Sequence, residues 1–145
     1  MSSSHVSAAL RREVRERAHG CCEYCLLDEE DAYFPHEPDH VVALKHGGAT
    51  VAANLALACL ECNRCKGTDL SSIDPLTATL APLYNPRSQE WGEHFEVVDG
   101  AIVGRTTVGR VAVTLLRIND SARVEVRRSL VSQRRWPPQR PGAEG

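Results

Sequence analysis

Apolar residues recur at helical spacing near the start of the chain. Leu10, Val14 and Ala18 fall on one stripe, and Ser7 precedes them as a residue type that caps helices. This pattern predicts a helix from Ser7 to about His19. Arginines and glutamates alternate on its opposite face, which predicts a solvated surface whose charges pair with one another.

The second half of the chain carries two further patterns. Residues 95–105 predict a hairpin, because Asp99-Gly100 favours a primed two-residue turn between apolar runs. Thr107 is then expected to cap a helix whose apolar residues recur at helical spacing, and a last helix is expected from about 119 to 131. The proline-containing segment 74–86 predicts an irregular connection.

The composition limits which classes of protein this chain can belong to. The 145 residues are 42% hydrophobic and 25% charged, which are ordinary values for one globular domain. The longest uncharged run, Gly47 to Leu60, is too short and too rich in small residues to cross a bilayer, and the first residues lack a signal-peptide pattern. We therefore expect a soluble, cytoplasmic protein without a membrane partner.

The charge pattern limits how nucleic acid could bind. The formal net charge of −2 gives no overall attraction for nucleic acid, so such binding has to come from local clusters. Arginine supplies fifteen of the seventeen basic residues. This usage suits bidentate phosphate contacts but also follows genome composition. A basic C-terminal segment could follow a DNA backbone or simply face solvent; it contains Arg123, Arg127, Arg128, Arg134 and Arg135.

Cysteine spacing indicates a metal site. Cys22 and Cys25 form one C-x2-C pair, and Cys59 and Cys62 form another after thirty-three intervening residues. Two such pairs in a chain without a secretory signal are typical of a structural zinc site, since each pair places two thiolates on one side of the ion. The alternative is two separate buried or redox-active pairs.

The register of the cysteine pairs is not unique. Cys21 precedes the first pair, and Cys65 forms another C-x2-C with Cys62. We prefer the matched pairs, which leave Cys21 and Cys65 outside the site and Asn63 directly after the last ligand. The long gap then forms a loop stapled by zinc at both ends.

The loop contains PHEPDHVVALKHGG, residues 35 to 48, with three histidines and two carboxylates. A structural interpretation is available. Val41, Val42 and Leu44 predict a short strand, Gly47-Gly48 its turn, and the histidines would be polar residues along its edge. On that interpretation nothing catalytic follows.

Taken in order, the motifs resemble the HNH endonuclease family in its variant with four zinc-binding cysteines. The resemblance spans about Arg11 to Gly67 and rests on C22-E-Y-C25, D39-H40-V-V-A-L-K-H-G47-G48, N54-L55 and C59-L-E-C62-N63-R-C-K66-G67. The segment that follows also resembles an extension found in a bacterial subgroup of this family.

The resemblance implies a ββα-metal core in which two strands, a loop and a helix surround a divalent cation. Asp39 matches the metal-binding carboxylate and His40 the general base. Asn54 matches the asparagine that holds the loop and orients the histidine, and Asn63 matches a metal ligand on the helix. Lys66 matches the closing lysine of the motif, whose role the family pattern leaves open. His36 and His46 are further possible site residues.

Chemistry read from the residues alone is compatible with this assignment. Adjacent side chains of a regular strand point to opposite faces, so we expect Pro38 to break the strand and let Asp39 and His40 flank one phosphate. Histidine suits proton transfer near neutral pH. Oxygen ligands from Asp39 and Asn63 favour Mg²⁺ or Mn²⁺ as the catalytic cation, whereas Zn²⁺ suits the thiolates.

The sequence thus predicts an α+β fold with a nuclease core at 7–70, a hairpin-and-helix extension at 71–135 on the same domain, and a disordered tail at 136–145. The expected function is a metal-dependent endonuclease acting on DNA, with RNA and oligomeric state left open. Two rivals remain. One is a non-catalytic zinc-knuckle module that binds nucleic acid, and the other is a thiol oxidoreductase, for which no βαβ setting is found.

Overall fold

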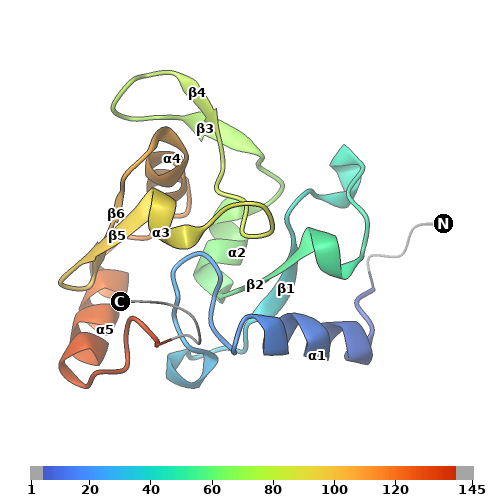
Figure 1. Cartoon of the computed structure of the whole chain (residues 1–145), viewed down its shortest axis with the longest axis horizontal. Helices are drawn as coiled ribbons and strands as arrows, with labels where there is room; N and C mark the ends of the chain where they lie inside the picture. Colours follow the sequence, from blue (N-terminus) through green and yellow to red (C-terminus); the bar gives the residue numbers. More distant parts are fainter. Residues whose placement is uncertain (1–4, 140–145) are drawn as a thin grey trace.

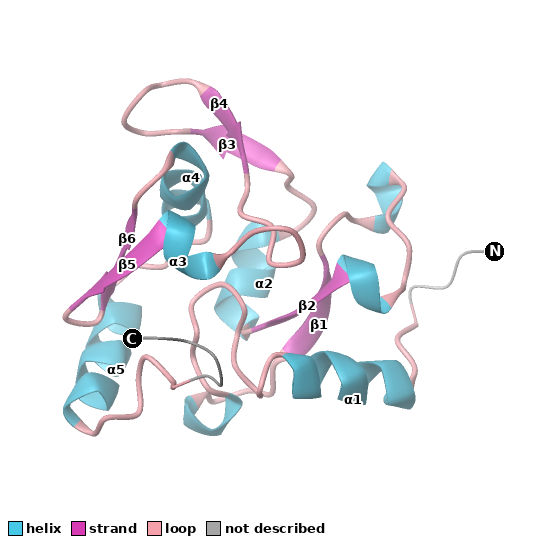
Figure 2. Ribbon diagram, viewed as in Figure 1, coloured by secondary structure: helices cyan, strands magenta, loops and turns pink. Residues whose placement is uncertain are grey.

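The computed structural model describes residues 5–139 and has an α+β fold, as predicted. Small antiparallel sheets of two strands each alternate with short helices (Figures 1 and 2). The elements are α1 (Ala8–Arg17), β1 (Glu37–His40), β2 (Leu55–Ala58), α2 (Leu60–Lys66), β3 (Ser71–Ile73), β4 (Leu80–Pro82), α3 (Trp91–His94), β5 (Phe95–Val98), β6 (Ala101–Gly104), α4 (Thr107–Leu115) and α5 (Ser121–Ser132).

Two strands and a helix form the centre of the N-terminal half. β1 pairs antiparallel with β2, so that Asp39 lies opposite Ala56 and His40 opposite Leu55, and α2 follows β2 directly. All four residues of β2 are buried, and α1 packs Val14 and Ala18 against its leucines. Ser7 caps α1 through its side chain, as expected. This antiparallel pair followed by a helix is the predicted ββα arrangement.

The strand that the structural interpretation placed at Val41, Val42 and Leu44 lies earlier in the chain, and the predicted break at Pro38 is wrong. The strand is Glu37–His40 instead of a run through Val41 and Val42. Pro38 lies opposite Leu57, whose backbone N–H and C=O bond instead to the side chain and backbone of Glu23 on the far side of β2. Because this pair exchanges no ladder hydrogen bond, the missing N–H of Pro38 leaves the strand intact.

The C-terminal half confirms one prediction and corrects others. β5 and β6 form the expected hairpin, with positive φ at both Asp99 (44°) and Gly100 (85°), the signature of a primed turn. The cap of α4 is Thr106 and not Thr107. The segment 74–86, expected to be irregular, belongs in part to the hairpin β3–β4. Its three-residue strands are too short to show a clear alternation of apolar and polar residues in the sequence.

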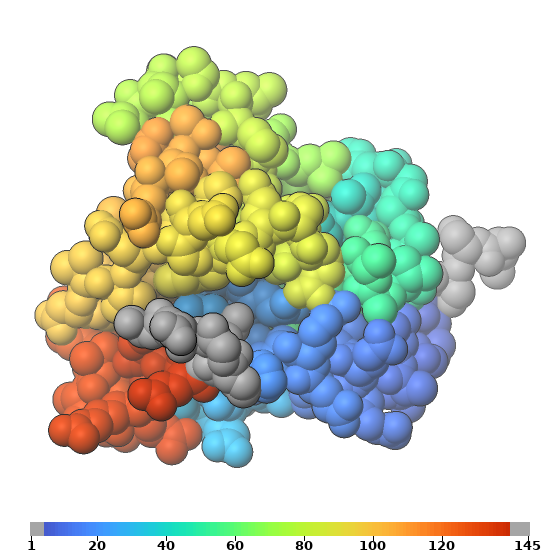
Figure 3. Space-filling view, in the orientation of Figure 1, coloured from blue at the N-terminus to red at the C-terminus, as the bar shows by residue number. Residues whose placement is uncertain are grey.

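Several contacts hold the C-terminal half against the ββα unit. Trp91 donates its indole N–H to the carbonyl of Tyr24 at 2.9 Å, and Glu23 pairs with Arg87. One continuous cluster of buried side chains runs from the cysteines through Phe95 to Leu130. In the space-filling view the yellow segment after β4 lies directly beside the green and teal segment of the ββα unit (Figure 3).

The expected disordered tail, residues 136–145, wrongly includes Trp136. Trp136 is 2% exposed and donates its indole N–H to the carbonyl of Cys25 at 3.1 Å. An aromatic side chain this well packed belongs to the folded structure. Residues 140–145 of the expected tail lie outside the described residues. Within 5–139, no helix is both long and apolar enough to cross a bilayer.

Candidate metal centre and active site

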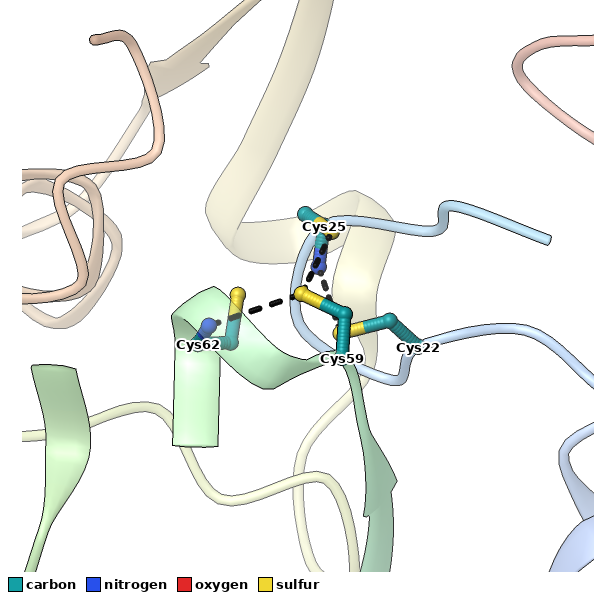
Figure 4. Close-up of side chains that lie close together, drawn as sticks. All are labelled: Cys22, Cys25, Cys59 and Cys62. Atoms are coloured by element: carbon teal, nitrogen blue, oxygen red, sulfur yellow. Dashed lines mark hydrogen bonds between the residues drawn. The ribbon is translucent and has the colours of Figure 1, made fainter. Parts of the chain in front are cut away.

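Four cysteines converge between the two halves of the molecule. Cys22 and Cys25 lie in the turn after α1, Cys59 caps α2, and Cys62 lies in its first turn (Figure 4). Their sulfur atoms all lie within 4.8 Å of one another, and the Cys25 and Cys59 sulfurs are 3.7 Å apart. Zn–S bonds of about 2.3 Å give a tetrahedral edge of about 3.8 Å, so the donor set fits a tetrahedral zinc ion.

The backbone around each C-x2-C pair supports this geometry. The N–H of Cys25 points at the sulfur of Cys22 at 3.5 Å, and the N–H of Cys62 points at the sulfur of Cys59 at 3.4 Å. Such contacts favour thiolates, the form that binds metal. Cys65 and Cys21 are not part of the cluster. The predicted choice of register is confirmed.

An arginine from α5 also contacts the cluster, and no sequence pattern indicated this contact. The Arg123 Nη2 atom lies 3.0 Å from the sulfur of Cys62 and 3.7 Å from that of Cys59, while Nη1 donates to the carbonyl of Leu116 at 2.7 Å. Burial alone would lower the pKa of Arg123, but the charge of Cys62 and the neighbouring thiolates raises it overall. Arg123, for which the sequence left contact with DNA or with solvent open, is therefore a neighbour of the clustered cysteine sulfurs.

Asp39 is buried beside a lysine. Its side chain is 8% exposed, and its Oδ2 atom lies 3.0 Å from the Nζ of Lys66, which is 1% exposed. Burial raises the pKa of Asp39, and the charge of Lys66 opposes this shift. Apart from the ion pair, Oδ2 makes no hydrogen bond of normal geometry, and neither does the buried hydroxyl of Tyr24. The Tyr24 hydroxyl also acts to lower the pKa of Asp39, so the carboxylate is held beside both Lys66 and Tyr24.

His40 is held from two sides. Its Nε2 atom lies 2.9 Å from the hydroxyl of Thr50, and its backbone carbonyl accepts a hydrogen bond from Lys66 at 2.8 Å. In the strand its side chain and that of Asp39 start on opposite faces. In the described residues no hydrogen bond joins them, yet the charge of His40 contributes to lowering the pKa of Asp39 against the larger effect of burial.

Asn54 closes the loop between the two strands. Its Oδ1 atom accepts the N–H of Val42 at 3.0 Å, and its Nδ2 atom donates to the carbonyls of Val42 and Ala49, both at 2.9 Å. A Cβ on Gly48 would lie 1.7 Å from the carbonyl oxygen of Val42. The loop that follows His40 is therefore tied to the strand by one amide and needs glycine at this close approach.

Asn63 lies on α2, half-buried and one turn before Lys66. Residues three apart lie on the same face of a helix. Asn63 is therefore on the face of α2 from which Lys66 contacts Asp39. In residues 5–139 no hydrogen bond joins the side chains of Asn63 and Asp39. The four cysteines form the one group of three or more His, Cys, Asp or Glu ligands in that part of the chain.

The other two histidines make structural contacts. His36 is fully buried, with its Nε2 atom 2.8 Å from the carbonyl of Leu27, and its backbone N–H donates to Glu29. His46 is exposed and lies 3.1 Å from the carbonyl of Thr68. These contacts hold both histidines in the fold, although the buried Nδ1 atom of His36 has no hydrogen-bond partner in the described residues.

The segment that carries these residues matches one known protein family. The family model described as HNH endonuclease matches residues 22–69. This segment is an HNH endonuclease domain. It covers about a third of the chain and includes the four cysteines, β1, β2 and α2. A search of curated proteins and a search of solved structures found no match.

Proposed function

We propose that the protein is a metal-dependent endonuclease that hydrolyses phosphodiester bonds in DNA. The observation that carries the proposal is the ββα unit of the HNH domain, which holds Asp39 and His40 on β1 and Asn63 and Lys66 on the facing helix. Hydrolysis needs a base for the attacking water and positive charge near the phosphate. Both kinds of group are available here within one small region.

In this proposal His40 is the general base. When Nε2–H donates to the Thr50 hydroxyl, Nδ1 keeps its lone pair and can take the proton of an attacking water. The hydrogen bond from Lys66 to the His40 carbonyl fixes the backbone at the same residue. Asn54 contributes indirectly, because it holds the loop that begins two residues after the base.

Asp39 and Asn63 would hold the catalytic cation, and the residues fit such an ion. The Oδ2 atom of Asp39 is buried and lacks a hydrogen bond of normal geometry, so it can still accept a ligand. Carboxylate and amide oxygens suit Mg²⁺ or Mn²⁺. A bound cation would stabilise negative charge on the phosphate and on the leaving oxygen. Lys66 helps to keep the buried carboxylate charged, which cation binding requires.

The four cysteines would bind one structural Zn²⁺. The ion would join the turn before β1 to the start of α2, and thereby fix both ends of the segment that carries Asp39 and His40. Arg123 would offset part of the negative charge of four thiolates around a divalent ion.

A second candidate is a zinc-knuckle module that binds nucleic acid without cleaving it. The ion pair between Lys66 and Asp39 favours this alternative, because the ammonium already neutralises the carboxylate that a cation would need. Cleavage of supercoiled plasmid by the zinc-loaded protein, with and without added Mg²⁺ or Mn²⁺, separates the two. Metal-dependent nicking supports the nuclease, and DNA binding without nicking under every metal supports the alternative.

A further inference from the structure

A cleft of about 280 Å³ separates the HNH domain from the C-terminal extension. The HNH domain contributes Val41, Val42, Lys66 and Asp69 to its lining. Lys66 connects the cleft to the proposed reaction site, because its Nζ atom is 2.8 Å from the His40 carbonyl and 3.0 Å from Asp39. A group bound in the cleft would therefore be a near neighbour of the scissile phosphate.

The opposite wall is an ordered loop of the extension. The N–H of Asn85 donates to the Oε1 atom of Gln89 at 2.8 Å, and the N–H of Arg87 donates to the Oδ1 atom of Asn85 at 2.8 Å. Arg87 also pairs with Glu23, which fixes the loop relative to the HNH domain. Because both amide oxygens are used inside the loop, the NH₂ groups of Asn85 and Gln89 are the donors that remain for a ligand.

The charges of the cleft disfavour a phosphate. Among its lining residues only Lys66 and Asp69 are charged, and Lys66 is already paired with Asp39. The exposed carboxylate of Asp69 adds a hydrogen-bond acceptor and a negative charge. Apolar side chains, among them Val41, Leu70 and Leu83, form much of the remaining lining. The ligand that fits this lining is uncharged, has an apolar face, and has both donors and acceptors at its edge.

A nucleobase has these properties, and it can present its edge to such a cleft only when it is unpaired and unstacked. We propose that the cleft binds one unpaired base of the DNA next to the phosphate that is cleaved, so that the preferred substrate is single-stranded, bulged or flapped DNA. The inference rests on the proposed nuclease function, but the binding that it describes can be measured without cleavage.

The test uses DNA oligonucleotides that carry 2-aminopurine, whose emission reports base stacking, at an unpaired or a paired position. With zinc-loaded protein and no added Mg²⁺, the unpaired probe should bind about tenfold more tightly than the paired one and change its emission on binding. Ser88→Trp, which fills the cleft from an exposed position, should remove both effects. Asp69→Asn should weaken the preference, while Ser132→Trp on α5 serves as the matched control.

The outcomes separate this inference from the proposed function. A preference for the unpaired base that Ser88→Trp removes supports the cleft, even if no variant nicks plasmid. Equal binding of paired and unpaired probes, or an effect of Ser88→Trp no larger than that of Ser132→Trp, overturns the inference although plasmid nicking persists. An RNA oligonucleotide of the same sequence distinguishes the source of the base, because selective capture of RNA over DNA would contradict a DNA substrate for the cleft.

Discussion

The four-cysteine cluster and the region around Asp39 and His40 differ in how complete they are. The cysteine sulfurs face one another at metal-binding distances, and the charged neighbour that contacts them, Arg123, favours their thiolate form. Asp39, in contrast, is paired with Lys66, and His40 is bonded to Thr50. The first region is therefore ready for its ion. In the second region, a cation has to compete with Lys66 for Asp39, and a substrate has to approach a His40 side chain that is already hydrogen-bonded to Thr50.

The largest expected effect belongs to the cysteine cluster. Cys59→Ser should abolish tight zinc binding and unfold the protein or make it insoluble, because a structural zinc site supplies much of the folding free energy of a small domain. Zinc content and circular dichroism measure the result. Cys65→Ser, outside the cluster, is the matched control and should retain both zinc and fold. A Cys59→Ser protein that stays folded with one zinc per chain would show that the cluster is not the metal site.

The second effect concerns the buried ion pair. Lys66→Met should destabilise the protein by about 3–5 kcal/mol, since it leaves the Asp39 carboxylate buried without its partner. Adding Asp39→Asn should restore much of the loss, because the remaining amide carries no charge. Urea unfolding of the two single variants and the double variant measures the coupling. Additive effects of the two substitutions would mean that the pair is not formed in solution.

Lys66→Met should also change how the stability of the protein depends on pH. Burial already raises the pKa of Asp39, and removing Lys66 should raise it further. A carboxyl group whose pKa is higher in the folded state binds more protons there than when unfolded. The stability of Lys66→Met should therefore decrease as pH rises from the ordinary carboxyl range through the raised pKa. If the stability loss of Lys66→Met relative to wild type became smaller as pH rises, this prediction would be contradicted.

Arg123 provides a smaller effect on the cysteine cluster. Arg123→Met should weaken zinc retention by about 10- to 100-fold, the range typical of groups that support metal ligands from outside. Transfer of zinc to a coloured chelator gives the rate of loss. Arg128→Met, an exposed position on the same helix, should release zinc as slowly as wild type. Equal rates for the two variants would show that the contact with Cys62 does not stabilise the site.

The smallest effect on stability in this series is expected at Asn54. Asn54→Ala removes three hydrogen bonds from the loop and should cost about 1–3 kcal/mol, with zinc content unchanged. Cleavage should fall at the same time, because the loop after His40 loses its anchor. Hydrogen exchange at the Val42 amide gives a local measure. Wild-type protection of that amide in the variant would argue against the anchoring role.

Sequence reasoning succeeded where short-range chemistry decides the structure. The Ser7 cap, the Asp99-Gly100 turn and each C-x2-C pair act over a few residues. The meeting of the two cysteine pairs is long-range, but it was predictable because a tetrahedral zinc ion needs four ligands. Sequence reasoning failed where partners come from far away in the chain. Pro38 was expected to break β1, but Glu23 takes the hydrogen bonds of the residue opposite to it. Such compensation leaves no local signal.

The same distinction applies to the candidate site. The motif order located β1 and α2, but it did not indicate that Lys66 would be buried against Asp39 or that Arg123 would reach the cysteines from α5. Lys66 is twenty-six residues from His40, and Arg123 is sixty-one residues from Cys62. Only packing of the whole chain brings these charges together. His36 was left open as a ligand, and its bond to the Leu27 carbonyl could be found only in the fold.

The central claim is that His40 acts as the base of a nuclease, and cleavage of supercoiled plasmid by His40→Ala tests it most directly. With Mg²⁺ present, cleavage should fall about 10²- to 10⁴-fold, the contribution typical of general acid–base catalysis. Zinc content, melting temperature and DNA affinity should stay close to wild type, and the exposed His46→Ala variant should cleave normally. A His40→Ala protein that cleaves plasmid as fast as wild type would contradict the account.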